Sequence, residues 1–403
     1  MPRCALILCC CAILGACGGD DPRARAVLRD SAGIRIAENE APDSARVTWW
    51  RLDPVPQFDV GKLEGAESET LFQVIGAVRL SDGRVAIANA GTSEVRYYAQ
   101  GGQHLVSAGR RGEGPGEFQR ITKLILLPGD SLAVMDPPAR RLGVLDPSGA
   151  FAREVLTSGD IGLNVIGRTS DGSWIASTSV RMVGQPFQQG YARPDLFYVA
   201  MPGGGGVLDT LGRFPGAERY IEIDAPGGRI TAINIGTPPF ARSTTVIAHQ
   251  NQLYVATQDA AEIVVYGSDG SLRRIVRTGV PLQPVTAEMI EQLLDRQLEG
   301  LDAERRGAAR AAQASTAGKF VPPYGSIAVD RSGNLWVQDF PGLEDAQRWT
   351  VYDGDGSVQA RIALPSRFTP YDIGDDWILG RELDELDVEH VRLYGIQRSL
   401  SAR

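Results

Sequence analysis

The chain has 403 residues, and its 49 acidic side chains outnumber its 41 basic ones, which gives a formal charge of −8. This acidic balance, together with the lack of a basic cluster, argues against nucleic-acid binding. Glycine (47 residues) and proline (24 residues) are abundant, but they lie as turns between short apolar runs. That distribution indicates many short strands rather than disorder.

The N-terminus predicts export. Arg3 precedes an apolar run at residues 5–14 and then small residues, as in a secretory signal peptide. Leu14-Gly15-Ala16-Cys17 resembles the bacterial lipobox, which implies cleavage before Cys17 and lipidation of its thiol. We therefore predict a signal peptide at residues 1–16 and a lipidated Cys17 with a polar tether at 17–32. The alternative is an ordinary signal peptide or a short anchor, although the run is too short to span a bilayer.

The predicted lipid anchor also suggests a location. A multiply acylated cysteine gives stable attachment to a membrane. Gly18 follows the cysteine, instead of the aspartate that retains lipoproteins at the inner membrane. The resemblance therefore implies the outer membrane, facing the periplasm or the cell surface. All five cysteines lie within the first 17 residues, so no disulfide framework is expected in the mature chain.

Beyond the tether, the chain repeats one pattern of short strands and tight turns. Each unit has an apolar strand, a Gly/Asp/Asn turn, a second strand, a polar bend, a third strand and a further glycine turn. Neighbouring units without insertions recur roughly every 40–45 residues, which is typical of β-propellers. The six units are Val74–Leu105, Ile121–Val155, Val165–Leu211, Thr245–Val276, Ser326–Leu364 and Tyr371–Arg398.

The connection between the first two units carries the most specific motif. Gly112-Glu113-Gly114-Pro115-Gly116-Glu117-Phe118 joins two strand patterns, and its glycines and proline require a shaped turn. This stretch, with Leu132 to Asp136 and Ile327 to Asp330, resembles NHL-type six-bladed propellers and the bacterial lipoproteins built on them. The resemblance covers roughly residues 34–398. It implies an all-β, six-bladed propeller.

Residues 33–403 are expected to form one propeller domain, as a monomer. Strand patterns at residues 33–38 and 47–52 belong to no complete unit, so an N-terminal strand is expected to complete the last blade and close the ring. Two units are separated by insertions. The first, at about residues 214–239, is expected to be a β-hairpin. The second, at about 284–318 between blades 4 and 5, contains a helix that Thr286 can cap.

The two ends of such a propeller differ. We call the end with the first-to-second and third-to-fourth strand turns the turn face, and the end with the blade connections and both insertions the insertion face. Long loops on a rigid scaffold are the usual place for binding. The candidate ligand-binding residues at the insertion face are Arg110, Arg111, Glu113, Asp136, Asp339 and Arg381. The alternative for Asp136 and Asp339 is a structural role, as acceptors for the amides of blade connections.

The sequence favours a non-enzymatic binding protein for a peptide, protein or glycan, with no cofactor. It contains no Gly-x-Ser-x-Gly motif, and its three histidines lack metal-ligand spacing. The alternative is a calcium-dependent, lactonase-like hydrolase, as some six-bladed propellers are. Asn89, Asp136 and Asp339 could supply part of a Ca²⁺ site, but no glutamate is well placed to complete it.

Overall fold

The computed structural model describes residues 26–42, 47–157, 163–178, 188–206, 209–298, 302–341 and 346–398. The predicted signal peptide, Cys17 and most of the tether lie outside the described residues. In the part of the chain that is described, no helix is long and apolar enough to cross a membrane.

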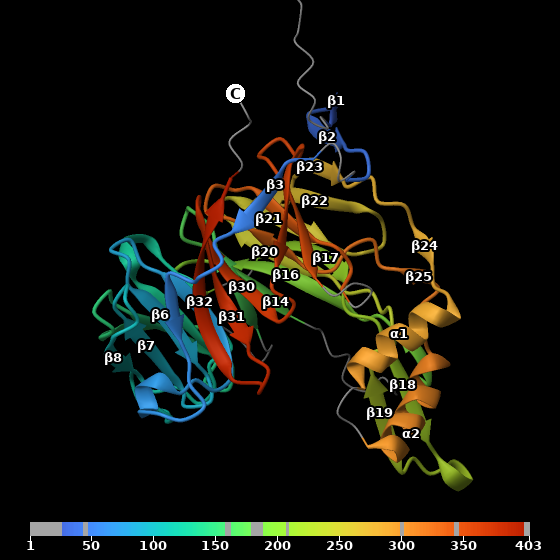
Figure 1. Cartoon of the computed structure of the whole chain (residues 1–403), viewed down its shortest axis with the longest axis horizontal. Helices are drawn as coiled ribbons and strands as arrows, with labels where there is room; N and C mark the ends of the chain where they lie inside the picture. The colour runs from blue at the N-terminus through green and yellow to red at the C-terminus, as the bar shows by residue number, and fades with distance from the viewer. Residues whose placement is uncertain are drawn as a thin grey trace, which may run out of the picture.

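Six antiparallel sheets follow one another along the chain and form a six-bladed β-propeller (Figure 1). Blade 1 comprises β5 (Val74–Arg79), β6 (Val85–Asn89), β7 (Glu94–Tyr98) and β8 (His104–Ala108). Blade 2 comprises β9 (Lys123–Leu126), β10 (Leu132–Asp136), β11 (Arg141–Leu145) and β12 (Phe151–Leu156). Blade 3 comprises β13 (Asn164–Arg168), β14 (Trp174–Thr178), β16 (Asp195–Met201) and β17 (Asp209–Pro215).

The second half of the ring repeats this order. Blade 4 comprises β20 (Thr245–His249), β21 (Gln252–Ala256), β22 (Glu262–Gly267) and β23 (Leu272–Arg277). Blade 5 comprises β26 (Ile327–Val329), β27 (Leu335–Gln338), β28 (Gln347–Tyr352) and β29 (Val358–Leu364). Blade 6 comprises β30 (Phe368–Ile373), β31 (Trp377–Leu383), β32 (Glu389–Gln397) and β4 (Phe58–Val60). The six predicted units are therefore the six blades.

The N-terminal segment closes the ring as expected, because β3 and β4 both pair with β32 of the last blade, and it also makes pairings that were not expected. Its first strands are β1 (Val27–Ser31), β2 (Ile34–Glu38) and β3 (Trp49–Leu52). The fourth strand of blade 6 is β4, which was not among the expected strands. β2 runs parallel to β23 of blade 4, and β3 bridges β29 of blade 5 and β32 of blade 6. The N-terminal segment thus contacts three blades.

Short turns shape the turn face as the sequence predicts. Gly83 and Gly149 have positive φ angles of 89° and 88°, which favour glycine. Asp146 accepts hydrogen bonds from the amides of Ser148 (2.8 Å) and Ala150 (3.0 Å). Its partners, the Ser148 hydroxyl first among them, lower the pKa of this carboxyl. Such side-chain bonds hold the tight connection between the third and fourth strands of blade 2.

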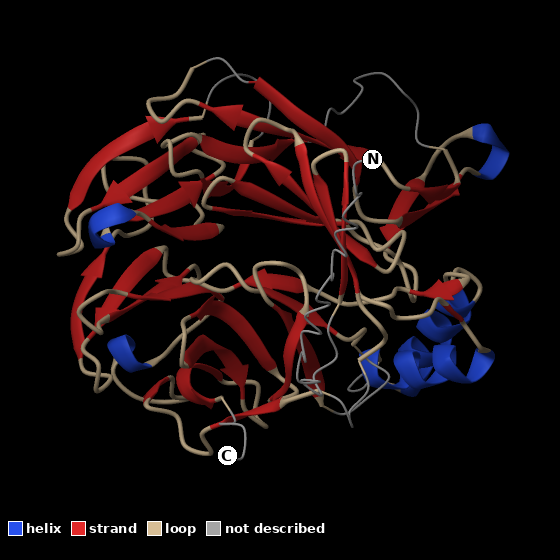
Figure 2. Ribbon diagram, turned by 90° about the horizontal axis from the view of Figure 1, so that it is seen from above, coloured by secondary structure: helices blue, strands red, loops and turns tan. Residues whose placement is uncertain are grey.

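The core lies between neighbouring blades, because each sheet buries both faces. Trp174, Trp336 and Trp377 open second strands and are buried in separate inter-blade clusters. These tryptophans therefore belong to the core. Figure 2 shows the sheets around the centre of the molecule, with the helices at its edge.

Both insertions are present. The first is a hairpin of β18 (Arg219–Asp224) and β19 (Ala232–Gly236), to which β15 (Gly190–Ala192) adds a third strand. The second contains α1 (Ala287–Gln297), α2 (Ala303–Ala314) and a small ribbon of β24 (Gln283–Pro284) with β25 (Phe320–Val321). Short 3₁₀ turns span Glu67–Glu69, Pro128–Asp130 and Pro226–Gly228.

The helical insertion lies within its expected bounds but contains one helix more than expected. Thr286 caps α1 by accepting a hydrogen bond from the Met289 amide (3.3 Å), as predicted, but a second helix, α2, follows. Figure 1 shows both insertions projecting from the same end of the molecule, opposite β1 and β2. Figure 2 shows them apart from one another. They form two arms that leave the insertion face.

Candidate functional site

The glycine-rich connection between blades 1 and 2 is held together by its own residues. Glu117 accepts hydrogen bonds from the Gly114 amide (2.9 Å) and from Arg110 Nε (2.7 Å), and these two partners lower the pKa of its carboxyl. Arg141, buried at the start of β11, donates to the carbonyls of Glu113, Gly114 and Glu117. The loop is therefore wrapped around a guanidinium of the adjoining blade.

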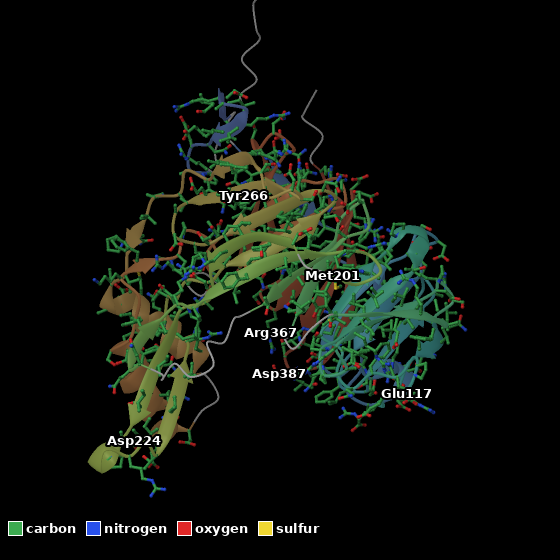
Figure 3. The ribbon with its side chains drawn as sticks, turned by 180° about the vertical axis from the view of Figure 1, so that it is seen from behind. Glu117, Met201, Asp224, Tyr266, Arg367 and Asp387 are labelled. Atoms are coloured by element: carbon green, nitrogen blue, oxygen red, sulfur yellow. The ribbon has the colours of Figure 1, made fainter. Side chains whose placement is uncertain are left out.

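The predicted binding residues of this loop lie at the surface. The Arg110 side chain is 78% exposed, and Arg111 and Glu113 are also exposed. The Glu113 carboxylate accepts a long hydrogen bond from Gln119 Nε2 (3.4 Å). Figure 3 shows Glu117 on the insertion face, toward the same end as Asp224 at the hairpin tip. These three side chains stay candidates for surface contacts.

Asp136 has the contacts of a structural residue. It is fully buried, and its carboxylate accepts the amides of Gln119 (2.9 Å) and Arg120 (3.1 Å) in the incoming connection. Asn89 does the same in blade 1, where its side-chain oxygen accepts the Phe72 amide (2.7 Å). A polar side chain at the end of the second strand therefore fixes each of these connections.

Arg381 also has a local partner. It pairs with Glu389 (2.8 Å), and the other carboxylate oxygen of Glu389 accepts the Val74 amide of blade 1 (2.9 Å). This bridge joins blades 6 and 1. The three residues predicted to meet at one point therefore have different partners: Asp136 binds amides that enter blade 2, Asp339 pairs with Arg361 of blade 5, and Arg381 pairs with Glu389 of blade 6. Their contacts do not gather them at one point.

Asp339, in contrast, lies at a pocket. A cavity of about 960 Å³ opens between blades 4 and 5, beneath the connection that carries the helical insertion. Its lining includes Asp339, Arg361, Thr350, Tyr352 and Pro322. A volume of this size is at the upper end of the range for ligand sites in proteins. We call it the inter-blade pocket, and it is the candidate site because a predicted binding residue, Asp339, lines it.

One face of blade 5 provides the floor of the inter-blade pocket. Thr350 on β28 lies opposite Val337 on β27 and Arg361 on β29. Residues two apart along a strand share a face, so Arg348, Thr350 and Tyr352 point to the same side. Tyr352 and Val337 belong to the apolar cluster with blade 4, whereas Arg348, Thr350 and Arg361 do not. The contact between the blades is therefore apolar near the turn face and polar toward the insertion face.

Arg361 is the most informative side chain in the inter-blade pocket. The residue is 8% exposed, it forms an ion pair with Asp339, and its guanidinium lies 5.3 Å from the centroid of the Trp49 ring. Its Nε is buried without a hydrogen-bond partner. Burial raises the pKa of the neighbouring Tyr352 hydroxyl, with a further contribution from Asp339. Burying an N–H donor of this kind costs free energy of folding unless an acceptor forms a hydrogen bond with it.

The lining of the inter-blade pocket is basic although the protein is acidic. Four arginines and one aspartate contribute charge from the described residues, namely Arg296, Arg348, Arg361, Arg367 and Asp339. Arg367 is tied to the second-to-third bend of blade 6 by its ion pair with Asp387 (Figure 3). The pocket wall also contains Pro281, Pro322, Pro323, Phe340 and Pro341. It can therefore hold a ligand that combines negative charge with apolar groups.

A second, smaller cavity adjoins this pocket. It measures about 520 Å³, lies between the bases of the two insertions, and shares Val321, Pro322 and Pro323 with the inter-blade pocket. Leu282 and Phe320 line it and are 52% and 51% exposed. We call it the apolar pocket. Exposed large side chains that gather at a cavity are a common sign of a binding surface.

The base of the hairpin is fixed by alternating charges. Asp259 pairs with both Arg193 (2.5 Å) and Arg242 (2.7 Å), and Arg242 also pairs with Glu218 at the root of β18 (2.5 Å). The carboxylate of Glu218, as its nearest partner, raises the pKa of Arg242. This network ties the hairpin to the bends of blades 3 and 4, so the apolar pocket has a fixed wall.

Sequence reasoning located Asp339 but missed Arg361, Thr350 and Arg348. A usable signal was present, because blades bury both faces and a charged residue in the middle of a strand interrupts that burial. Arg361 stands in the middle of the apolar strand Val358–Leu364. In a propeller, a charged residue in the middle of an apolar strand indicates that the apolar contact with the neighbouring blade is interrupted there.

No acidic cluster supports a metal site. Within the described ranges, no group of three or more His, Cys, Asp or Glu side chains is placed to hold a metal ion. Asn89 and Asp136 are occupied by backbone amides of different connections. Among the described residues, these contacts give no support to the Ca²⁺ site that the hydrolase alternative requires.

Comparison with known proteins gives only distant similarities. No family model and no curated protein matches the chain. Among solved structures, it resembles a DUF4221 family member from Bacteroides vulgatus, with 8% identity, a TM-score of 0.49, and 86% and 98% of the two chains covered. It also resembles the calcium-binding protein regucalcin from Agrobacterium tumefaciens, with 13% identity, a TM-score of 0.41, and 88% and 97% of the two chains covered. A third similar structure is virginiamycin B lyase from Staphylococcus aureus, with 11% identity, a TM-score of 0.43, and 86% and 99% of the two chains covered. Similarities this distant carry no inference about ligand or activity. The NHL type likewise stays a prediction.

Proposed function

We propose that this protein is a lipid-anchored, extracytoplasmic binding protein that holds an acidic segment of a peptide or protein at its insertion face. One observation carries the proposal: the nearly buried guanidinium of Arg361 lines the inter-blade pocket with an unsatisfied Nε. A guanidinium presents its donors in a fixed fork that matches a carboxylate. A carboxylate from a ligand would add an acceptor to the one that Asp339 provides.

The surroundings of Arg361 favour an anion over a neutral ligand. Arg348 and Arg367 add positive charge on the same pocket, and Thr350 adds a hydroxyl. In a partly buried site, such charges act across a lower effective dielectric constant than in water. More basic than acidic side chains thus line this pocket, although the protein is acidic overall.

The neighbouring surfaces favour a chain over a small ion. The apolar pocket shares a wall with the inter-blade pocket, and the two insertions project on either side of it. An extended peptide presents charged and apolar side chains a few ångströms apart along one backbone. It can thus place a carboxylate beside Arg361 and an apolar side chain beside Phe320 or Leu282.

The test uses two peptides that differ only in charge. The mature protein is titrated with an acetylated, amidated peptide of alternating alanine, leucine and glutamate, and with the same peptide carrying glutamine in place of glutamate. We expect saturable binding of the acidic peptide alone in isothermal titration calorimetry. Arg361→Gln should weaken that binding by about tenfold or more, because it removes a charge-assisted partner.

Two further variants complete this test. Arg213→Gln, an exposed ion-pair partner on the outer strand of blade 3, serves as the matched control and should bind like the parent protein. The double variant Arg110→Gln, Arg111→Gln asks whether the glycine-rich connection binds instead. Loss of binding in that double variant, with Arg361→Gln unaffected, would move the site to the connection and refute the inter-blade pocket.

The membrane anchor is a separate part of the proposal and is supported by the motif at residues 14–17. In a diderm host we expect the full chain to incorporate an alkyne analogue of palmitate and to fractionate with the outer membrane. Cys17→Ala should abolish both the labelling and the membrane association. An unlabelled parent protein in the soluble periplasmic fraction would show that the signal peptide is an ordinary one.

A further inference from the structure

The structure holds a second basic pocket, on the turn face, which the proposed function does not use. A cavity of about 650 Å³ lies where β2 of the N-terminal segment meets the turns of blade 4. Its lining includes Arg35, Arg273, Arg274, Asn251 and Gln252. Of the described residues that line it, Val265 alone has an apolar side chain, so this cavity, which we call the turn-face pocket, suits a hydrophilic ligand.

Arg274 is the unusual residue of this pocket. Four arginines among the described residues are buried, namely Arg96, Arg141, Arg274 and Arg361. The other three pair with carboxylates, those of Glu94, Glu154 and Asp339. Arg274 is 8% exposed, has no ion pair within the described ranges, and has a buried Nε without a hydrogen-bond partner.

An unpaired guanidinium in such a position is costly, because the protein must remove a charge from water without compensation. Arg274 does lie within hydrogen-bond reach of the Tyr254 hydroxyl, whose pKa is raised chiefly by burial, lowered by the charge and hydrogen bond of this guanidinium, and raised in part by Asp330. A neutral hydroxyl does not balance the charge. A ligand with a negative charge would do so.

The amide side chains next to Arg274 point to the same kind of ligand. The Asn251 side-chain oxygen accepts the Ser170 amide (3.0 Å), and the Gln252 side-chain oxygen accepts the Tyr254 hydroxyl (3.0 Å). Their NH₂ groups have no acceptor among the described residues. The pocket therefore offers donors to its ligand: two amides and a guanidinium.

The remaining charges of the pocket are compensated. Arg35 pairs with Asp355 (3.2 Å), and Arg273 pairs with Asp269 (2.9 Å), whose other oxygen accepts the Ser271 amide (3.0 Å). Among the described residues that line the pocket, Asp269 is the one acidic side chain. Because it is already occupied, it does not supply the missing partner of Arg274.

We propose that the turn-face pocket is a second binding site, independent of the inter-blade pocket, for a hydrophilic ligand that carries an oxyanion, such as a sugar phosphate or a phosphorylated polyol. Arg274 binds the oxyanion, and the NH₂ groups of Asn251 and Gln252 donate to its oxygens or to adjacent hydroxyls. The same chemistry occurs in a free metabolite and in a phospholipid headgroup.

The experiment titrates the mature protein with glucose 6-phosphate, inorganic phosphate and, as the uncharged control, glucose. We expect saturable binding of glucose 6-phosphate, weaker binding of phosphate, and none of glucose. Vesicles that contain phosphatidylglycerol form a further arm, in which the Cys17→Ala protein is used so that the proposed lipid anchor does not itself cause cosedimentation. If the protein cosediments with them through Arg274 while glucose 6-phosphate does not bind, the ligand is a headgroup. If the sugar phosphate alone binds, the ligand is free in solution.

The decisive variant is Arg274→Met, which keeps much of the side-chain volume and removes the charge. It should weaken binding by about tenfold or more while keeping or raising the melting temperature, since a buried unpaired charge is removed. Arg277→Gln, at the other end of the same strand and outside this pocket, is the matched control and should bind normally. Arg361→Gln should also bind glucose 6-phosphate normally, which separates the two sites.

Three results would overturn the second site. One is unchanged affinity in a folded Arg274→Met protein. Another is a lower melting temperature of that variant with intact binding, which would assign Arg274 a structural role. The third is the absence of saturable binding in every arm. If Arg274→Met does not fold, the affinity of Gln252→Ala for glucose 6-phosphate is measured instead. Unchanged affinity in that variant refutes the site.

Discussion

Deletion of residues 33–60 is expected to abolish cooperative unfolding of the propeller. The deletion removes β4, the outer strand of blade 6, and also removes β3, which joins β29 to β32. Trp50, Phe58 and Val60 are buried in the clusters that flank blade 6. Loss of this segment opens a sheet edge and exposes apolar surface on both sides of the blade.

Thermal unfolding followed by far-ultraviolet circular dichroism and by tryptophan fluorescence tests this expectation. In the parent protein the two signals should change together in one sharp transition. In the deletion variant we expect broad transitions that do not coincide. A matched control removes only residues 26–31, because every residue of β1 is exposed and this strand pairs only with β2. A sharp, unshifted transition in the 33–60 deletion would refute closure by this segment.

The architecture was predictable because its determinants are local. Each blade repeats its own turn chemistry, such as Gly83 and Gly149 at positive φ and Asp146 bonded to the amides that follow it. Strands between such turns are neighbours in sequence, so their pairing needs no distant information. The pairing of the N-terminal strands is different. β2 lies beside β23, more than 200 residues away, and nothing within either strand specifies that partner.

The site was predictable only in part, for a related reason. The alternative given for Asp136, a structural acceptor for a blade connection, matches its contacts. For Asp339 the contact seen is a different one, because its carboxylate pairs with Arg361 across blade 5. The two residues occupy equivalent places in the repeat, so the repeat cannot tell them apart. What distinguishes Asp339 is the gap between blades 4 and 5, which depends on the packing of the helical insertion.

Phe118→Ala is expected to destabilise the protein by about 3–5 kcal/mol, the usual cost of removing a buried phenylalanine ring. Phe118 ends the glycine-rich connection and is 1% exposed, within the cluster between blades 1 and 2. Two glycines make room for its ring: a Cβ added to Gly109 or to Gly143 would lie 2.7 Å from a ring carbon. The connection is therefore built around this side chain, and the free energy of unfolding from urea denaturation measures its contribution.

Two companion variants make this expectation specific to the ring. Gly143→Ala should also destabilise, because it forces a methyl group into the space that the ring occupies. Arg110→Ala should cost less than about 1 kcal/mol, since its ion pair with Glu117 involves a side chain that is 78% exposed. If Phe118→Ala cost no more than Arg110→Ala, the ring would not be what holds the connection. The glycines would then serve the backbone turn alone, and Arg141, which donates to three carbonyls of the loop, would be the residue that fixes it.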